Sequence, residues 1–262
     1  MPEIRPAFDD ADAYERYMGR WSHAIGETFL HWLAPPKDAR WLDMGCGTGA
    51  FSQVIAERCA PKSLSGIDPS EAQIAFARRK LPNADLRVAD SMALPFGDGE
   101  FDVVASALVL HFIPDRARAF AEMKRVALPG GIVAGYTWER TPESSGAPYA
   151  PMLRGIRSMG LEPLRSPTVP EQTLDGLHAS AKAAGFSDIA VTQLEAVRRF
   201  SNFDEYWDVQ TLTVAPIGKM VAGFDDAQRQ RLRETMRGIV PIAANGSISY
   251  AARAVALKAR AA

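Results

Sequence analysis

Cysteine is scarce in this sequence: its 262 residues include two, Cys46 and Cys59. A disulfide framework needs several cysteine pairs, and a structural zinc site needs cysteine and histidine ligands at short, paired spacings. The two cysteines and the four histidines form neither pattern. We therefore expect no disulfide framework, no bound metal and a reducing compartment.

The sequence also has no surplus of charge of one sign. Thirty lysine and arginine residues oppose 31 aspartate and glutamate residues, and the formal net charge is −1. Proteins that bind nucleic acid usually carry a basic face, whereas the basic residues here are spread along the chain. We therefore expect a partner other than DNA or RNA.

A long hydrophobic run is absent as well. The longest nearly apolar segment, Val103–Ile113, has eleven residues, whereas a membrane-spanning helix needs about 20. The first residues, MPEIRPAFDDADAY, are acidic and interrupted by proline, unlike a signal peptide. We expect a cytoplasmic protein without a membrane partner, and its length suits one large domain with a full hydrophobic core.

Between residues 40 and 138, short apolar segments alternate with segments of helical periodicity. This alternation predicts an α/β fold with a Rossmann-like, doubly wound, mostly parallel sheet and helices on both faces. A later helix and two later strands bring the expected sheet to seven strands. The expected strands lie at 41–44, 64–67, 85–89, 101–110, 132–138, 189–197 and 248–257, and the helices at 50–60, 70–81, 114–127 and 172–184. Such sheets bind ligands at the carboxyl ends of their strands.

Two segments interrupt this pattern and are interpreted as cap or lid insertions. Residues 139–170 hold six of the eighteen prolines, and residues 200–246 contain the aromatic stretch FSNFDEYW and a charged helix at 225–237. A connection as long as residues 200–246 is more than a turn between two strands. We expect one domain over 1–262, made of a helical cover at 1–34, a cofactor-binding core at 40–138, the two insertions, and the rest of the sheet at 171–199 and 247–262.

Three glycines follow the first expected strand within the segment WLDMGCGTGAF. Gly45, Gly47 and Gly49 join this strand to a helix, and a turn without Cβ atoms lets a ligand touch the backbone. The dinucleotide fingerprint of nicotinamide-dependent oxidoreductases is G-x-G-x-x-G, but here the third glycine comes one residue early. Asp43, just upstream, suits a cationic or amine-bearing ligand better than a pyrophosphate.

The segment LDMGCGTG closely resembles motif I of the class I S-adenosylmethionine-dependent methyltransferases. Four later segments, SGIDPS, VADSMALPF, FDVVASALVLHFIPD and RVALPGG, resemble the later motifs of this family and fall in the same order. The resemblance is specific over about residues 40–138 and looser over 172–197 and 248–258. It implies the class I fold and S-adenosylmethionine as the cofactor, with S-adenosylhomocysteine as the product.

The resemblance also implies a role for individual residues. Gly45 and Gly47 would allow close approach of the methionine part of the cofactor, and Asp43 would hold its ammonium group directly or through water. Asp68 would accept hydrogen bonds from both ribose hydroxyls, because two vicinal donors match one carboxylate. Asp90 would accept from the adenine amine. The other implied contacts are Cys46 and Gly49 in the glycine loop, Pro69, Ser91 and Met92 around the adenine, and Ala107 on the methionine side.

An aromatic stripe runs along the expected N-terminal helix. Its members are Tyr14, Tyr17, Trp21, Ile25, Phe29 and Trp32. For Trp21, Ile25 and Phe29 we favour plain packing against the domain. In similar methyltransferases an N-terminal segment folds over the cofactor, so Tyr17 and Arg20 are candidate cofactor contacts. Arg20 would pair bidentately with the cofactor's carboxylate.

Methyl transfer from a sulfonium is an in-line displacement, so the protein mainly aligns the acceptor and excludes water. A general base is needed when the acceptor must lose a proton early. His111, just after the fourth strand, is the candidate catalytic base, and the alternative is a histidine packed under the cap or capping a helix. Glu139 and Tyr136, at the end of the fifth strand, are further candidates.

The residues at the end of the fourth strand narrow the acceptor class. The NPPY-type tetrapeptide of adenine and glutamine methylases is absent there, where the chain has SALV. We therefore expect a small-molecule acceptor. A cofactor-binding protein without transferase activity stays open as an alternative, and a nicotinamide-dependent oxidoreductase is disfavoured by the glycine spacing. The acceptor's identity, the atom that is methylated, and a monomeric or homodimeric state are left open.

Overall fold

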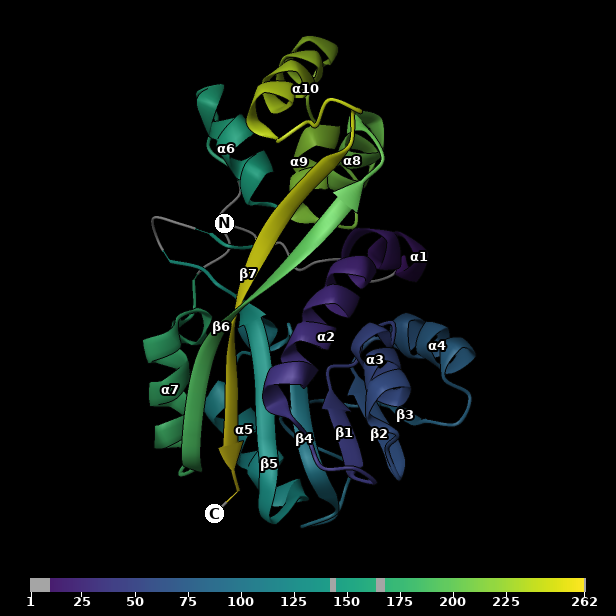
Figure 1. Ribbon diagram of the computed structural model, residues 1–262, viewed down its shortest axis with the longest axis vertical. Helices are drawn as coiled ribbons and strands as arrows, with labels where there is room; N and C mark the ends of the chain where they lie inside the picture. The colour runs from purple at the N-terminus through teal and green to yellow at the C-terminus, as the bar shows by residue number, and fades with distance from the viewer. Residues whose placement is uncertain (1–9, 142–144, 164–167, 262) are drawn as a thin grey trace.

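The computed structural model describes residues 10–141, 145–163 and 168–261. Seven strands form one sheet in the order β3-β2-β1-β4-β5-β7-β6 (Figure 1). They are β1 (Arg40–Met44), β2 (Ser63–Asp68), β3 (Asp85–Val88), β4 (Phe101–Ala107), β5 (Ala127–Trp138), β6 (Ser187–Phe200) and β7 (Ile248–Arg260). The first five strands pair in parallel, and β7 runs antiparallel to both β5 and β6. The predicted fold class, a doubly wound and mostly parallel sheet, is confirmed.

Helices cover both faces of this sheet because successive strand side chains point to opposite sides. On one face, α2 and α3 pack on a core that includes Trp41 and Val103, and on the other face α5 and α7 pack on a core that includes Leu42 and Val104. The helix bounds are α2 (Arg20–Leu33), α3 (Ala50–Cys59), α4 (Glu71–Lys80), α5 (Arg116–Val126) and α7 (Leu174–Ala183). No helix in the described part of the chain is both long and apolar enough to cross a membrane.

The N-terminal helix is continuous but changes its winding. It consists of α1 (Ala11–Tyr14), a π-helical turn η1 (Glu15–Gly19) and α2. Trp21, Ile25 and Phe29 are fully buried, which confirms the packing interpretation for these three residues. Figure 1 shows this helix crossing the sheet from its lower part toward the cap. Residues 1–9 of the expected cover lie outside the described residues.

The cap is built on the two longest strands of the sheet. In Figure 1, β6 and β7 continue as a twisted ribbon past the carboxyl ends of the parallel strands and reach a group of helices. These helices are α6 (Ala150–Ser158), α8 (Phe203–Gln210), α9 (Pro216–Ala222) and α10 (Asp226–Ile239). Two of these helices are capped by the side chain just before them: Asn202 accepts from Glu205 N at the start of α8, and Asp225 accepts from Gln228 N at the start of α10. Within the first expected insertion, residues 142–144 and 164–167 lie outside the described part.

Several element boundaries differ from the sequence expectation. The fourth strand, expected to reach residue 110, ends at Ala107 because Leu108 turns the chain with a φ of 61°. A short 3₁₀ turn, η2 (Leu110–Phe112), comes next. The helix expected over 172–184 begins after Thr173, whose side chain caps α7 by accepting from Gly176 N, and the preceding turn is η3 (Pro170–Gln172).

The sixth strand is longer than expected. The sequence predicts it over 189–197, but it runs from Ser187 to Phe200 because it pairs with β7 as far as Phe200, opposite Ile248. The tertiary pairing therefore carries the strand beyond its apolar centre and into the cap.

Candidate functional site

The glycine loop follows β1 at the carboxyl edge of the sheet. Gly45, Gly47 and Gly49 have φ values of 82°, 53° and 78°, in the left-handed region that only glycine adopts without strain. A Cβ at Gly45 would lie 2.5 Å from Val109 Cγ2, and one at Gly47 would lie 2.7 Å from Gln73 Oε1. The loop therefore needs bare backbone both for its shape and for its close approach to neighbouring side chains.

Asp68, at the end of β2, is tied directly to the glycine loop. Its Oδ2 accepts from Gly47 N at 3.1 Å, and its Oδ1 accepts from Ser70 N at 2.9 Å. Burial raises the pKa of Asp68, and these two backbone donors oppose that rise. Each carboxylate oxygen can accept more than one hydrogen bond. Asp68 can therefore accept further hydrogen bonds from a ligand that lies on the loop.

Asp43, in the last part of β1, is fully buried below the loop. Its Oδ2 accepts from Ser52 Oγ at 2.6 Å, while its Oδ1 has no hydrogen-bond partner in the described chain. Burial raises its pKa to about 7, and the nearby Asp68 adds to this rise. A buried oxygen without a partner is rare in native proteins. It fits a site that receives an ammonium group or a bridging water.

The raised pKa of Asp43 predicts a pH-dependent stability. Between about pH 4 and pH 7 the folded protein holds a proton that the unfolded chain has released, so this contribution to stability declines as pH rises through that window. We expect the melting temperature of the ligand-free protein, relative to an Asp43→Asn variant, to fall between pH 5 and pH 8. An Asp226→Asn variant of an exposed acid is the control, and parallel melting curves for wild type and Asp43→Asn would contradict the expectation.

A second group of predicted residues gathers at the carboxyl ends of β2 and β3. Ala89 N donates to the backbone oxygen of Asp68 at 3.1 Å, which places the two strand ends together. Asp90 is exposed, and its Oδ1 accepts from Met92 N at 2.8 Å. Ser91 and Met92 are half-buried, and Pro69 is exposed. The structure thus brings these residues beside Asp68, on the sheet edge that carries the glycine loop.

The two N-terminal candidates, Tyr17 and Arg20, have different surroundings in the structure. Tyr17 is buried in η1, whereas the Arg20 side chain is 68% exposed and its Nη1 lies 3.5 Å from Glu205 Oε1 of α8. The structure does not bring the Arg20 guanidinium to the glycine loop.

Glu15, which the sequence pattern does not single out, does reach the loop. Its carboxylate accepts from Thr48 Oγ1 at 2.7 Å and from Lys80 Nζ at 2.9 Å. It therefore joins η1 to the glycine loop and to α4. The acid stands on the first turn after a short helix, and nothing in the local sequence distinguishes it from a solvated charge.

His111 lies in η2, just after β4 and close to Ala107, which is half-buried at the end of that strand. Its Nδ1 lies 2.9 Å from Thr137 Oγ1 of β5. Burial lowers its pKa to about 4, and the charge of Arg140 adds to this effect. The imidazole is therefore neutral at neutral pH, with one ring nitrogen engaged by a hydroxyl.

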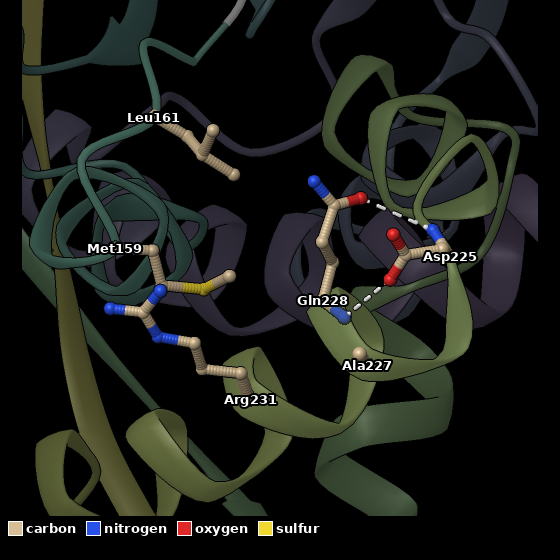
Figure 2. A pocket seen from close by; sticks show the side chains of 6 residues that line it. All are labelled: Met159, Leu161, Asp225, Ala227, Gln228 and Arg231. Carbon is tan, nitrogen blue, oxygen red and sulfur yellow. Dashed lines mark hydrogen bonds between the residues drawn. The ribbon is translucent and has the colours of Figure 1, made fainter.

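A separate hollow lies in the cap between the end of α6 and the start of α10. Two of its polar side chains bind each other's backbone: Gln228 Oε1 accepts from Asp225 N at 3.2 Å, and Asp225 Oδ1 accepts from Gln228 N at 2.7 Å (Figure 2). The lining residues are Met159, Leu161, Asp225, Ala227, Gln228 and Arg231. These bonds form the N-terminal capping box of α10, so we assign the hollow a structural origin.

The described residues contain no group of three or more histidine, cysteine, aspartate and glutamate side chains placed to hold a metal ion. Both cysteines are free, Cys46 buried in the glycine loop and Cys59 at the end of α3.

Comparison with protein families gives a match over the same part of the chain. Residues 42–135 match the family described as "Methyltransferase domain". This range begins in β1, includes the glycine loop and Asp68, and ends within β5.

Two curated relatives agree with this match. The demethylmenaquinone methyltransferase of Thermus thermophilus is 33% identical over 165 residues, which cover 56% of this chain and 74% of that enzyme. The chloroplastic tocopherol O-methyltransferase of Arabidopsis thaliana is 36% identical over 110 residues, 40% of this chain. That alignment spans 32% of the tocopherol enzyme, less than two thirds of its length.

The structural comparison covers the whole chain. The geranyl diphosphate C-methyltransferase of Streptomyces coelicolor, solved with Mg²⁺, geranyl diphosphate and S-adenosylhomocysteine, superposes with a TM-score of 0.53 at 15% identity, over 100% of this chain and 86% of that one. At this identity the likeness concerns the fold.

Proposed function

Because the chain belongs to the class I S-adenosylmethionine-dependent methyltransferases, we propose that it transfers the methyl group of S-adenosylmethionine to a small-molecule acceptor. The observation that carries this proposal is the junction of Asp68 with the glycine loop, where a β2 carboxylate binds Gly47 N at 3.1 Å. Asp68, which ends β2, and the glycine loop, which follows the neighbouring strand β1, lie together at the carboxyl edge of the sheet, where such sheets bind ligands.

In this proposal each part of the cofactor is assigned to residues of the chain. The amino-acid part would lie against Gly45, Cys46, Gly47 and Gly49, with its ammonium group served by the unpartnered oxygen of Asp43. Asp68 would accept from the ribose hydroxyls. The adenine would be held by Asp90, with Pro69, Ser91 and Met92 around it, and Ala107 would line the methionine side.

The N-terminal helix supplies the cover in this proposal. Tyr17 lies in η1, and Glu15 on the same turn already binds Thr48 of the loop. For Arg20 to reach the cofactor's carboxylate, its guanidinium has to leave Glu205. We retain Arg20 as a proposed contact on that condition.

The bound cofactor supplies an electrophilic methyl carbon, and the protein has to orient the acceptor and keep water away. In this proposal the buried aromatic side chains of the cap, such as Trp138, Phe200 and Tyr206, would keep water away. In this proposal His111 would take a proton from an acceptor; its position after β4 and its Nδ1 contact with Thr137 Oγ1 support this role. With a pKa of about 4 it is unprotonated, but weakly basic, at neutral pH.

We expect His111→Ala to lower turnover at least tenfold while the dissociation constant for S-adenosylhomocysteine changes less than twofold. Turnover of the wild-type protein should be flat between pH 6 and pH 8, because a base with a pKa of about 4 is unprotonated throughout this range. Steady-state rates with the first acceptor found in a screen would check this, with His178→Ala, an exposed histidine of α7, as the control. Equal rates for wild type and His111→Ala would assign His111 to packing.

The experiment that tests the proposed function is a screen of small acceptors with S-adenosylmethionine labelled in its methyl group. Transfer of label to one or more acceptors supports a methyltransferase. Tight binding of S-adenosylhomocysteine without transfer to any member of a broad panel would favour the second candidate, a cofactor-binding protein without transferase activity.

We further propose that the chain is one domain, works in the cytoplasm and has no nucleic-acid partner. The pairing of β6 with β7 along their whole length supports one domain, because these strands belong both to the sheet and to the cap. The free cysteines support the cytoplasmic location, and the net charge of −1 supports the absence of a nucleic-acid partner.

A further inference from the structure

A buried guanidinium lies in the cap without a bound carboxylate among the described residues. Arg198, near the end of β6, is 5% exposed. Its Nη1 donates to the backbone oxygen of Tyr17 at 3.0 Å, and its Nη2 to that of Arg16 at 3.3 Å. Its guanidinium carbon lies 4.5 Å from the centre of the Phe200 ring. All of these partners are neutral, and Nε has no partner in the described chain.

The nearby acid is already engaged elsewhere. Glu205 Oε2 accepts from Ser201 N at 2.7 Å, and Glu205 Oε1 lies 3.5 Å from Arg20. Burial lowers the pKa of Arg198 to about 10, and Arg20 adds to this, while Tyr250, Glu205 and Tyr17 oppose it. Arg198 therefore remains charged at neutral pH. A buried charge is costly unless it is paired, so the site favours an anion that the described residues do not supply.

Three more buried polar atoms without partners in the described chain lie around the same place. They are Trp21 Nε1, Tyr206 Oη and Gln210 Oε1. The Tyr250 ring joins them: its centre is 5.3 Å from that of Trp21 and 6.0 Å from that of Tyr206, and Gln210 Nε2 donates to its hydroxyl at 3.1 Å.

Arg198 belongs to this group through Phe200, whose ring is stacked on Tyr250 with centres 6.0 Å apart and an interplanar angle of 9°. We call the six residues the Tyr250 cluster: Trp21, Arg198, Phe200, Tyr206, Gln210 and Tyr250. Buried polar groups in native proteins are nearly always satisfied by protein, water or ligand. Four partnerless atoms in one cluster therefore point to a bound group.

The Tyr250 cluster lies next to the proposed site of methyl transfer. Trp21 packs edge to face on Trp138, the last residue of β5, with ring centres 6.2 Å apart. On the other side, Arg198 holds the carbonyl of Tyr17, which lies on the same π-helical turn as Glu15 and its contact with Thr48. In Figure 1 the end of β6 and the start of β7 lie beside α8, above the carboxyl ends of β4 and β5.

We propose that the Tyr250 cluster is the subsite for the carboxylate of the methyl acceptor, and that this acceptor is an aromatic acid bearing a hydroxyl group. Arg198, Trp21 and Tyr206 offer donors to the carboxylate, and Gln210 offers an acceptor to the hydroxyl. The aromatic side chains of the cluster suit a planar molecule. This inference rests on the proposed methyltransferase function, since it assigns the acceptor of that site.

The test compares aromatic acids with neutral molecules of the same shape. We would titrate the protein, loaded with S-adenosylhomocysteine, with 4-hydroxybenzoate and 3,4-dihydroxybenzoate, and with their carboxamides, by isothermal calorimetry. We expect at least one acid to bind at least tenfold more tightly than its amide. Arg198→Met should reduce that preference to twofold or less. Arg199→Met, the neighbouring exposed residue of the same strand, should leave it intact.

The outcomes separate this inference from the proposed function. If no acid binds the wild-type protein better than its amide, or if Arg198→Met keeps the preference, the inference is wrong. If Arg198→Met does not fold, Arg198→Lys keeps the charge but loses the planar donor set, and we expect a severalfold smaller preference; an unchanged preference contradicts the inference. Failure of the wild-type protein to bind S-adenosylhomocysteine contradicts the proposed function instead.

Discussion

Replacing Asp68 by alanine is expected to weaken the binding of S-adenosylhomocysteine at least tenfold, a loss of about 1.4 kcal/mol or more. The substitution removes the proposed acceptor of two ribose hydroxyls, and unpaired buried donors are costly. It also releases Gly47 N and Ser70 N, which the carboxylate holds at 3.1 and 2.9 Å. The loss therefore combines a missing ligand contact with a looser glycine loop.

Calorimetric titration would measure this effect directly. Asp68→Asn is an intermediate variant, because its amide oxygen can still accept from one of the two backbone donors while its amide nitrogen cannot accept from the other. Asp85→Ala, an exposed acid at the start of β3, is the control. An Asp68→Ala protein that binds S-adenosylhomocysteine as tightly as the wild type would remove Asp68 from the site.

Replacing Gly45 by alanine is expected to reduce the affinity for S-adenosylhomocysteine at least tenfold as well. Its φ of 82° strains any other residue, and the new Cβ would lie 2.5 Å from Val109 Cγ2. The loop therefore has to shift. Gly130→Ala is a matched control, because Gly130 has a φ of 73° and a Cβ there would meet no described heavy atom within 4 Å.

The matched pair separates backbone strain from crowding at the site. Both variants carry a left-handed alanine, which costs about 1–2 kcal/mol, but we expect only Gly45→Ala to lose ligand affinity. The double variant Gly45→Ala/Val109→Ala removes the two shortest contacts, at 2.5 and 2.7 Å, leaves Val109 Cβ at 3.0 Å, and should recover part of the loss. Equal affinities of Gly45→Ala and Gly130→Ala would show that the loop is not a binding surface.

The sheet and the acids at its edge could be predicted from the sequence because their signals are local. Most of the parallel strands are short apolar runs, with β3 (DLRV) as the exception, and α4, α5 and α7 have local side-chain N-caps. Asp43 and Asp68 stand at or next to the residues that end their strands. The parallel topology then brings strand ends together, so residues far apart in sequence meet at one edge.

The features that the sequence does not predict depend on contacts between distant segments. Glu15 reaches Thr48 and Lys80 because η1 lies across the glycine loop, and no local pattern encodes that crossing. Arg20 faces Glu205 of α8, a helix within the second insertion, whose position the sequence pattern does not indicate. The early end of β4 results from the positive φ of Leu108, a conformation rarely adopted by a leucine.

The surroundings of Arg198 also could not be predicted from the sequence. Along the end of β6, Leu194, Ala196, Arg198 and Phe200 alternate with exposed residues and are all buried. The alternation predicts that the side chain at 198 points inward. The local sequence does not indicate the tyrosines, tryptophan and glutamine of its cluster, because these come from other elements of the fold.

The most direct test of the proposed cofactor site is calorimetric titration of the purified protein with S-adenosylhomocysteine, repeated in the presence of excess NADH. We expect one binding site per chain and an affinity that NADH leaves unchanged, because in the proposed site the glycine loop and Asp43 bind the amino-acid part of the cofactor. Absence of binding, or displacement by NADH, would contradict the assignment.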